Sequence, residues 1–235
     1  MAMELPKKTP VRSYKTDFKK TESPLSEGGL WLNGRKDGID WCDVLVKNGE
    51  AFGEVSRNQV KELRAEQATL GAGAAVGAAV GDYDDPTAVL TGDWGKDQYG
   101  KVRVFSRNQS NKYFQEVQIR LRHNMRPKFC SGYEVFFRIL DTDEGYAEIV
   151  RWNGPVGGWT SLKKLIGKKY GVKDGDVIEA SIVGNLITGY LNGQEMISIV
   201  DDHIKSGAPG IGFNFGVGTT TADHGVTSFE VHTYD

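Results

Sequence analysis

From Gly175 to Phe215 the chain reads GDVIEASIVGNLITGYLNGQEMISIVDDHIKSGAPGIGFNF. Apolar and polar residues alternate in three short runs of this segment. The runs cover residues 178–183, 185–191 and 196–200. Asn192 and Gly193, between the second and third runs, are typical of a type I′ hairpin turn, in which both central residues take positive φ. The segment therefore predicts consecutive antiparallel strands rather than helices.

The same pattern recurs on both sides of this segment. Short runs rich in β-branched and aromatic residues are separated by Asn, Gly, Pro and Asp, which are turn residues. The expected strands are 13–18, 30–32, 39–46, 87–90, 99–106, 114–121, 133–140, 146–152, 159–162 and 227–234. Regular short strands favour an all-β, two-sheet antiparallel sandwich over an α/β fold. We expect the last run to pair with the first, which places the two termini together.

The length of 235 residues suits one large all-β domain, because sandwiches of roughly 200–250 residues often form a single unit. We expect a flexible segment at 1–12 and a single sandwich domain at 13–235. An insertion at 56–81 interrupts the β pattern, with a helix-favouring run that begins at Ser56 and a low-complexity run, GAGAAVGAAVG. It is expected to lie on the surface, as a flexible insert, a loop packed over the sheet or a contact surface for a partner.

Composition excludes several classes of partner. The net charge of −2 argues against nucleic acid, and no run approaches the ~18 apolar residues of a membrane span. The basic start MAMELPKKTPVRSYK lacks the apolar core of a secretory signal, so the protein is either cytoplasmic or extracellular after removal of a leader. Cys42 and Cys130 allow one disulfide, but two reduced thiols with at least one in the core is the favoured interpretation.

Polar side chains alternate along three of the predicted strands, in the runs EVQIRLR, YEVFFRIL and YAEIVRW. Side chains point alternately to the two faces of a sheet, so Arg122 is expected on the same face as Arg120. If the three strands are neighbours, one face carries Gln118, Arg120, Glu134, Arg138 and Glu148. Such a face is either simply solvated or lines a groove, in which arginine suits carboxylate recognition through two parallel hydrogen bonds.

The run RWNGPVGGWTSL places two tryptophans beside a loop rich in glycine. Indole faces stack on the apolar faces of sugars, and a neighbouring amide such as that of Asn153 bonds hydroxyl groups. The alternative for Trp152 and Trp159 is a place in the core.

The phrases GDVIEASIVGNLITGYLNG, SGAPGIGF and GYEVFF together resemble concanavalin A-like (laminin G-like) lectin/glucanase domains. The resemblance covers residues 82–234, and residues 13–55 fit it loosely. It implies a jelly-roll sandwich that handles carbohydrate, although a fold does not determine an activity. It also implies a structural calcium ion, for which the acidic turns supply oxygen ligands. The candidate ligands are Asp82, Asp84 and Asp85, or Asp141 and Asp143.

A non-catalytic, lectin-like module that binds a polysaccharide or glycan is the preferred function. Its expected binding residues are Trp152, Asn153, Trp159, Arg120, Arg122 and Arg138. A structural or adhesive protein assembled through the Gly/Ala-rich insertion is a further alternative.

A polysaccharide-degrading enzyme is the main alternative. Its catalytic candidates are Gln118, Arg120, His123, Tyr133, Glu134 and Glu148. A uronate lyase is favoured over a glycoside hydrolase, because laminarinase-like hydrolases carry an ExDxE-type strand motif and here position 120 is arginine. The resemblance to jelly-roll lyases is limited to the fold, since their Gln-Ile-His strand reads Gln118-Ile119-Arg120 here.

Overall fold

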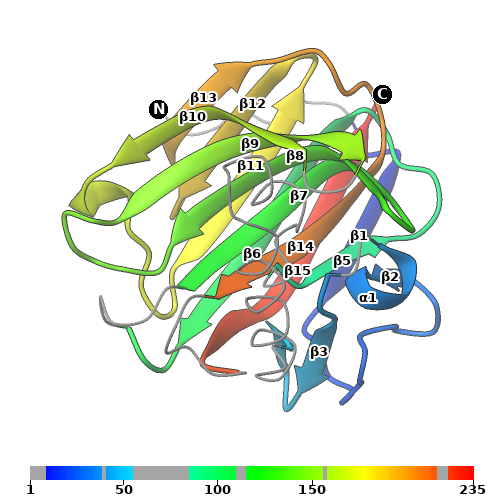
Figure 1. The fold of residues 1–235 in the computed structure, drawn as a ribbon, viewed down its shortest axis with the longest axis horizontal. Helices are drawn as coiled ribbons and strands as arrows, with labels where there is room; N and C mark the ends of the chain where they lie inside the picture. Colours follow the sequence, from blue (N-terminus) through cyan, green and yellow to red (C-terminus); the bar gives the residue numbers. More distant parts are fainter. Residues whose placement is uncertain (1–8, 39–40, 55–84, 110–114, 156–157, 216–221) are drawn as a thin grey trace, which may run out of the picture.

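The computed structural model describes residues 9–38, 41–54, 85–109, 115–155, 158–215 and 222–235, and within them the strands form two antiparallel sheets (Figure 1). The first sheet runs in the order β13 (Gln194–Val200), β12 (Leu186–Leu191), β11 (Val177–Val183), β6 (Asp97–Ser106), β15 (His224–Tyr234), β4 (Glu50–Gly53), β3 (Val44–Lys47), with β1 (Arg12–Thr16) also on β15. The second runs in the order β10 (Trp159–Ile166), β9 (Tyr146–Pro155), β8 (Phe129–Arg138), β7 (Gln115–Arg126), β14 (Ala208–Phe215), β5 (Thr87–Leu90), β2 (Trp31–Asn33). Two single turns of helix, α1 (Gly34–Asp37) and the 3₁₀ turn η1 (Lys168–Tyr170), complete this part of the chain.

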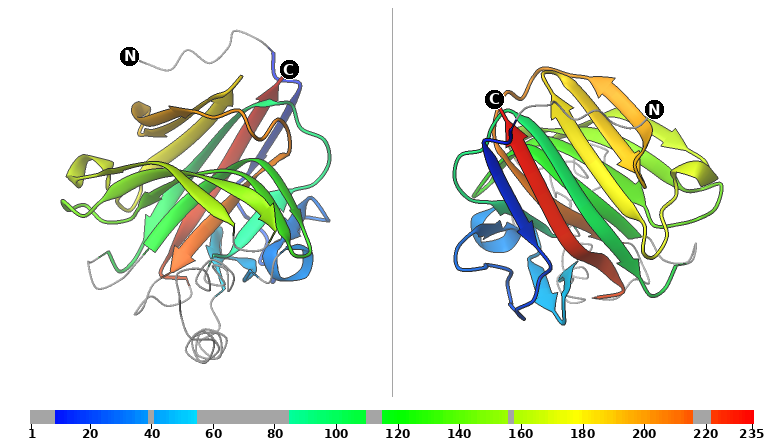
Figure 2. Two further views of the ribbon diagram at one scale, coloured as in Figure 1. Left: turned by 45° about the horizontal axis from the view of Figure 1, so that its top comes forward. Right: turned by 180° about the vertical axis from the view of Figure 1, so that it is seen from behind.

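The prediction of a two-sheet antiparallel sandwich of jelly-roll type is confirmed, and Figure 2 shows its two layers. Asn192 and Gly193 have φ of 51° and 79°, as a type I′ turn between β12 and β13 requires. The expected pairing of the first and last strands is also found, with Arg12 opposite Thr233. The insertion expected at 56–81 lies outside the described residues.

The main core lies between the two sheets. On β7, Val117 and Ile119 point into it, and Phe229 and Val231 of β15 meet them from the other sheet. Because side chains alternate along a strand, this arrangement sends the polar residues of β7 to the opposite side of the seven-stranded sheet. We call that side the outward face.

A second, smaller apolar cluster covers part of the outward face. Its members are Trp41, Cys130, Phe136, Tyr146, Val150 and Trp152. The outward face is therefore packed with side chains, and the polar groups beneath this cluster need partners within the protein.

Both Cys42 and Cys130 are buried and unbridged, which confirms the interpretation of two reduced thiols. No helix among the described residues has the length and apolarity needed to cross a membrane.

Candidate functional site

Strands β7, β8 and β9 lie side by side in the seven-stranded sheet. Their register places Arg120 opposite Glu134, Glu116 opposite Arg138, and Glu148 opposite Phe136. The prediction that one sheet face carries five polar residues is therefore confirmed. These residues are Gln118, Arg120, Glu134, Arg138 and Glu148.

The guanidinium of Arg120 is fully buried at the centre of this face. Its Nη1 donates to Glu134 Oε2 at 2.6 Å, and its Nη2 contacts Thr87 Oγ1 at 2.8 Å, Gln118 Oε1 at 2.7 Å and Asp85 Oδ2 at 3.2 Å. Gln118 Nε2 donates in turn to Asp85 Oδ1 at 2.7 Å. Arg120 is thus committed to an internal network, and its Nη groups already have acceptors.

Two indoles enclose this network. The Arg120 guanidinium lies 4.9 Å from the ring centroid of Trp41 and 5.7 Å from that of Trp152. The two rings meet edge to face at 4.8 Å, and Trp152 Nε1 donates to Glu134 Oε2 at 2.6 Å. Of the two places expected for Trp152, a binding residue beside the loop or a residue in the core, the structure shows burial. Trp152 lies within β9, 3% exposed, because its N–H and its ring both have partners there.

A pocket of about 160 Å³ opens on the outward face, over β7 to β10. Its aromatic and aliphatic walls are Phe136, Tyr146, Val150, Trp152 and Trp159. Its polar walls are Asp85, Glu116, Gln118, Glu134, Glu148, Lys164 and Asn214. Trp159, the first residue of β10, is 47% exposed and pairs across the strands with Trp152. One wall of the pocket therefore ends in an accessible indole.

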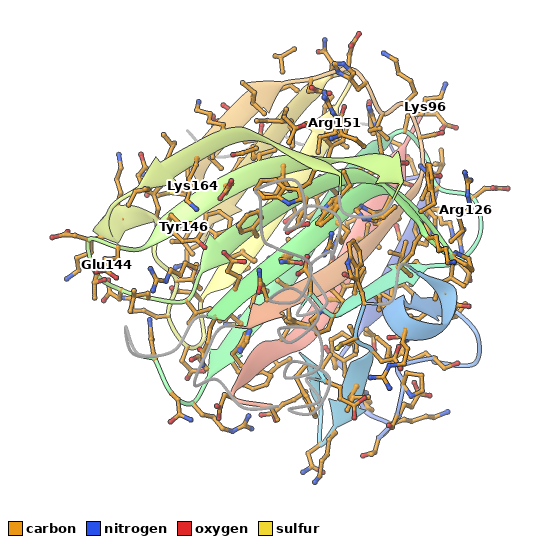
Figure 3. All side chains as sticks on the ribbon, in the orientation of Figure 1. Lys96, Arg126, Glu144, Tyr146, Arg151 and Lys164 are labelled. Carbon is orange, nitrogen blue, oxygen red and sulfur yellow. The ribbon has the colours of Figure 1, made fainter. Side chains whose placement is uncertain are left out.

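Glu148 is paired with the cation of the neighbouring strand. Lys164 Nζ lies 2.8 Å from Glu148 Oε2, and Ser161 Oγ donates to Glu148 Oε1 at 2.6 Å. The same ammonium lies 3.6 Å from the ring centroid of Tyr146. Figure 3 shows Tyr146 and Lys164 close together on adjacent strands. These contacts hold Glu148 in an ion pair at the side of the pocket.

The environment of Glu116 disfavours the charged form of its carboxyl group. Burial raises the pKa of this carboxyl to about 8, and the charges of Glu134 and Glu148 act in the same direction. A hydrogen bond from the Tyr146 hydroxyl to Glu116 Oε1 and the positive charge of Lys164 lower the pKa in part. At neutral pH the pocket therefore holds a protonated Glu116 beside the ion pair of Glu148 and Lys164.

Arg122 does not reach this face, so the prediction that it lies with Arg120 is wrong. The register of β7 against β8 shifts between Leu121 and Asn124, and Arg122 takes a φ of 48°. Its guanidinium donates instead to three backbone carbonyls at 2.7–3.0 Å. A β-bulge re-aims a side chain in this way because two residues oppose one on the partner strand.

The catalytic set expected for a lyase does not come together. Tyr133 points away from the outward face and donates to Asp201 Oδ1 at 2.5 Å. His123 is buried with Nε2 2.8 Å from Cys130 Sγ, and burial holds the pKa of its ring well below the ordinary value. Neither residue lines the pocket beside Gln118.

Asn153 and Arg138 lie at the margins of the site. Asn153 alternates with Trp152 to the other face of β9, where it bonds Thr160 Oγ1 at 3.0 Å. Arg138 shares the outward face, where its Nη1 contacts the carbonyl of Glu144 at 3.3 Å. The structure therefore brings Glu134, Glu148, Trp152 and Trp159 to one pocket and leaves Asn153 outside it.

The expected calcium ligands find little support among the described residues. Both oxygens of Asp85 are engaged by Gln118 and Arg120, and Asp141 lies 3.5 Å from the ammonium of Lys173. Within the described ranges no group of three acidic, histidine or cysteine side chains is placed to hold a metal ion. Asp85 and Asp141 are thus engaged by other partners, and Asp82 and Asp84 lie outside the described part.

Tyr146 and Lys164 are among the pocket residues that were not candidates from the sequence. Tyr146 shares the alternation of Glu148 and Trp152 along β9, so the pattern YAEIVRW contains the signal for it. Lys164 gave no such signal, because the strand expected at 159–162 ends before it. The observed β10 continues through a register shift between Ser161 and Lys163, which brings Lys164 opposite Glu148.

No protein-family model and no curated protein matches the sequence. Solved structures match over most of the chain. The carbohydrate-binding module CBM66 from Bacillus subtilis has a TM-score of 0.52 at 10% identity, over 85% of this chain and 98% of that one. The β-glucanase of Bacillus licheniformis has a TM-score of 0.54 at 10% identity, over 94% and 98%.

The exoplasmic/lumenal domain of VIP36, in a form bound to Ca²⁺ and Man3GlcNAc, has a TM-score of 0.56 at 10% identity, over 94% of this chain and 91% of that one. The fold is that of the concanavalin A-like lectin/glucanase β-sandwiches, as the resemblance implied. At such identities the likeness establishes the fold alone.

Replacing Arg120 tests the buried network. Arg120→Ala removes the cation from two buried carboxylates, so we expect the free energy of unfolding in urea to fall by about 3–5 kcal/mol. Arg120→Lys should recover little of this loss, since a point charge does not reproduce the planar fork. The matched control is Arg103→Ala on the exposed side of β6, with an expected change within about 0.5 kcal/mol. A loss below about 1 kcal/mol for Arg120→Ala contradicts the role assigned to the network.

The neutral Glu116 predicts a pH dependence of stability. Its folded pKa of about 8 exceeds the ordinary value of 4.5, so its contribution is complete below pH 4.5 and is lost as the pH rises through 8. The pKa of His224 is lowered to about 4, so the contribution of this residue to the free energy of unfolding rises with pH, but only up to about pH 6.5. Between pH 6.5 and 8 we therefore expect the free energy of unfolding to fall by up to about 2 kcal/mol through Glu116.

Glu116→Gln supplies the comparison, because an amide stays uncharged and still accepts the Tyr146 hydrogen bond. The fall between pH 6.5 and 8 should be smaller in this variant than in the wild type. Equal slopes for the two proteins in urea melts across this range would mean that Glu116 is ionised in the folded state.

Proposed function

We propose that the pocket on the outward face binds a glycan. The observation that carries this proposal is the half-exposed Trp159 at the edge of a pocket whose walls alternate aromatic rings with carboxylates and an ammonium. An indole offers a flat apolar surface to the C–H face of a sugar ring, and carboxylates accept hydrogen bonds from its hydroxyls. The names of similar folds, a carbohydrate-binding module and a lumenal domain bound to Man3GlcNAc, support the same class of ligand.

The role of Trp152 differs from that of Trp159. Its ring is fixed by Trp41, Arg120 and Glu134, so it forms a rigid floor for the pocket. A rigid floor lowers the entropy lost on binding, because fewer rotamers must be frozen when the ligand arrives. In this proposal Trp159 makes the stacking contact and Trp152 supports it.

Trp159→Ala tests the stacking contact. On a glycan identified by array screening, we expect binding about tenfold weaker than that of the wild type, as the loss of an aromatic contact of about 1.4 kcal/mol implies. Isothermal titration measures the change. The matched control is Leu186→Ala, since Leu186 is 45% exposed and lies on β12 of the other sheet. Unchanged affinity in Trp159→Ala, or an equal loss in both variants, contradicts the assignment of this pocket.

Glycoside hydrolysis is a second candidate, favoured by the raised pKa of Glu116 beside the ion-paired carboxylate of Glu148. A glycosidase uses one carboxyl group that stays protonated as the acid and a second one as the base or nucleophile. Glu116 would donate its proton to the glycosidic oxygen as the bond between that oxygen and the anomeric carbon breaks. Glu148 would accept a proton from the water that attacks the same carbon. The glucanase with a similar fold adds support at the level of the fold only.

Release of reducing ends from the bound glycan separates the two candidates. If the protein is a hydrolase, Glu116→Gln and Glu148→Gln should each lower the rate by about 10²-fold or more while binding persists. Glu179→Gln is the control, because Glu179 is also a poorly exposed carboxylate but lies on β11 of the other sheet. If the wild type binds the glycan and releases no reducing ends, hydrolysis is rejected and the binding module remains.

A further inference from the structure

The pocket beside Trp159 is small for a whole sugar. Its volume is about 160 Å³, whereas pockets that enclose a ligand usually measure roughly 300–1,000 Å³. It therefore admits one substituent of a ring, or part of a ring, while the remainder of the ligand rests against Trp159 at its edge. The chemistry of the walls then decides which substituent fits.

An anionic substituent, such as the carboxylate of a uronate, meets the wrong charges. Asp85, Glu134 and Glu148 line the walls, and like charges repel one another more strongly in a partly buried site than in water. Arg120, which would otherwise bind a carboxylate, already contacts four acceptors in the network. The pocket is therefore unsuited to acidic sugars.

A cationic substituent, such as a free amine, also meets opposition. Glu148, the most exposed of the carboxyl groups that line the pocket, already holds Lys164 at 2.8 Å, so a second ammonium would compete with this lysine and be repelled by it. The neutral Glu116 supplies no compensating charge. Both signs of charge are thus disfavoured, and the substituent should be uncharged.

Among uncharged substituents, the walls fit one with both an apolar end and a polar group. Phe136 and Val150 belong to the buried apolar cluster and offer a surface to a methyl group. The Lys164 ammonium and the protonated Glu116 are donors for a carbonyl, and Glu148 is an acceptor for an N–H. A lone hydroxyl would leave the apolar wall without a contact.

We propose that this pocket binds the acetamido group of an N-acetylhexosamine, with the sugar ring against Trp159. This inference rests on the proposed glycan-binding function and names its ligand class. The methyl group lies toward Phe136 and Val150, and the amide bonds the polar wall formed by Glu116, Glu148 and Lys164.

A matched ligand series tests the inference. The probes are methyl glycosides of glucose and of galactose that carry a hydroxyl, an ammonium or an acetamido group at carbon 2, in buffer acidic enough to keep the amine protonated. Titrations of the 235-residue chain, followed by NMR shifts of backbone amides, give the six dissociation constants. For at least one of the two sugars the acetamido form should bind ten times or more tighter than its two counterparts, as an extra apolar contact with paired amide groups implies.

Val150→Leu tests the site within the protein. One added methylene narrows the pocket, so the preference for acetamido over hydroxyl should fall severalfold while the affinity for the hydroxyl form changes little. The matched control is Val183→Leu, since Val183 is 42% exposed on β11 of the other sheet. Thermal melts show whether both variants are folded. The ligand series on the wild-type protein tests the inference even if a variant does not fold.

The outcomes separate this inference from the proposed function. Equal binding of the acetamido and hydroxyl forms, or tightest binding of the ammonium forms, overturns the acetamido inference and leaves glycan binding in place. The same conclusion follows if other glycans bind to the protein but none of the six probes does. If no glycan binds at all and Trp159→Ala alters nothing, the proposed function itself is rejected.

Discussion

The guanidinium of Arg120 is fully buried and meets four acceptors, and this arrangement constrains the rest of the outward face. A buried cation is costly unless its charge and its hydrogen bonds are satisfied, so Glu134, Asp85, Thr87 and Gln118 must hold their positions around it. These residues come from β5, β7, β8 and the segment before β5. Arg120 thereby joins strands that are distant in the sequence.

The same constraint explains a glycine in the segment that decides the fold. A Cβ on Gly212 of β14 would lie 2.2 Å from Gln118 Oε1 and 2.8 Å from Arg120 Nη2. Only a residue without a side chain leaves room for the network, which rests directly on the β14 backbone. The GIGF sequence therefore serves both as a strand of the sandwich and as the base on which the site is built. The network fixes Trp152, and Trp152 in turn forms the floor of the pocket next to the exposed Trp159.

Side-chain alternation is the part of the structure that the sequence predicts well. It identifies the sandwich, the hairpin at Asn192 and Gly193, and the shared face of Arg120, Glu134 and Glu148. It does not predict what covers a face, because burial depends on residues far along the chain such as Trp41. For this reason the sequence left open whether Trp152, at the end of its predicted strand, is exposed or enclosed, and the structure shows it enclosed.

Register shifts are the second limit of prediction from the sequence. A one-residue shift moves each following side chain to the other face, and no pattern of residue types marks where the shift occurs. The bulge after Leu121 removes Arg122 from the outward face, and the shift between Ser161 and Lys163 adds Lys164 to it. Both changes alter the charge of the pocket, and with it the class of ligand that fits.

A crystal structure of the protein with a glycan recovered from an array screen tests the central claim most directly. The account predicts electron density for a sugar ring against the indole of Trp159, with one substituent directed into the pocket toward Phe136 and Val150. Density for the glycan on the eight-stranded sheet, or at the ends of the sandwich with the pocket empty, would contradict it.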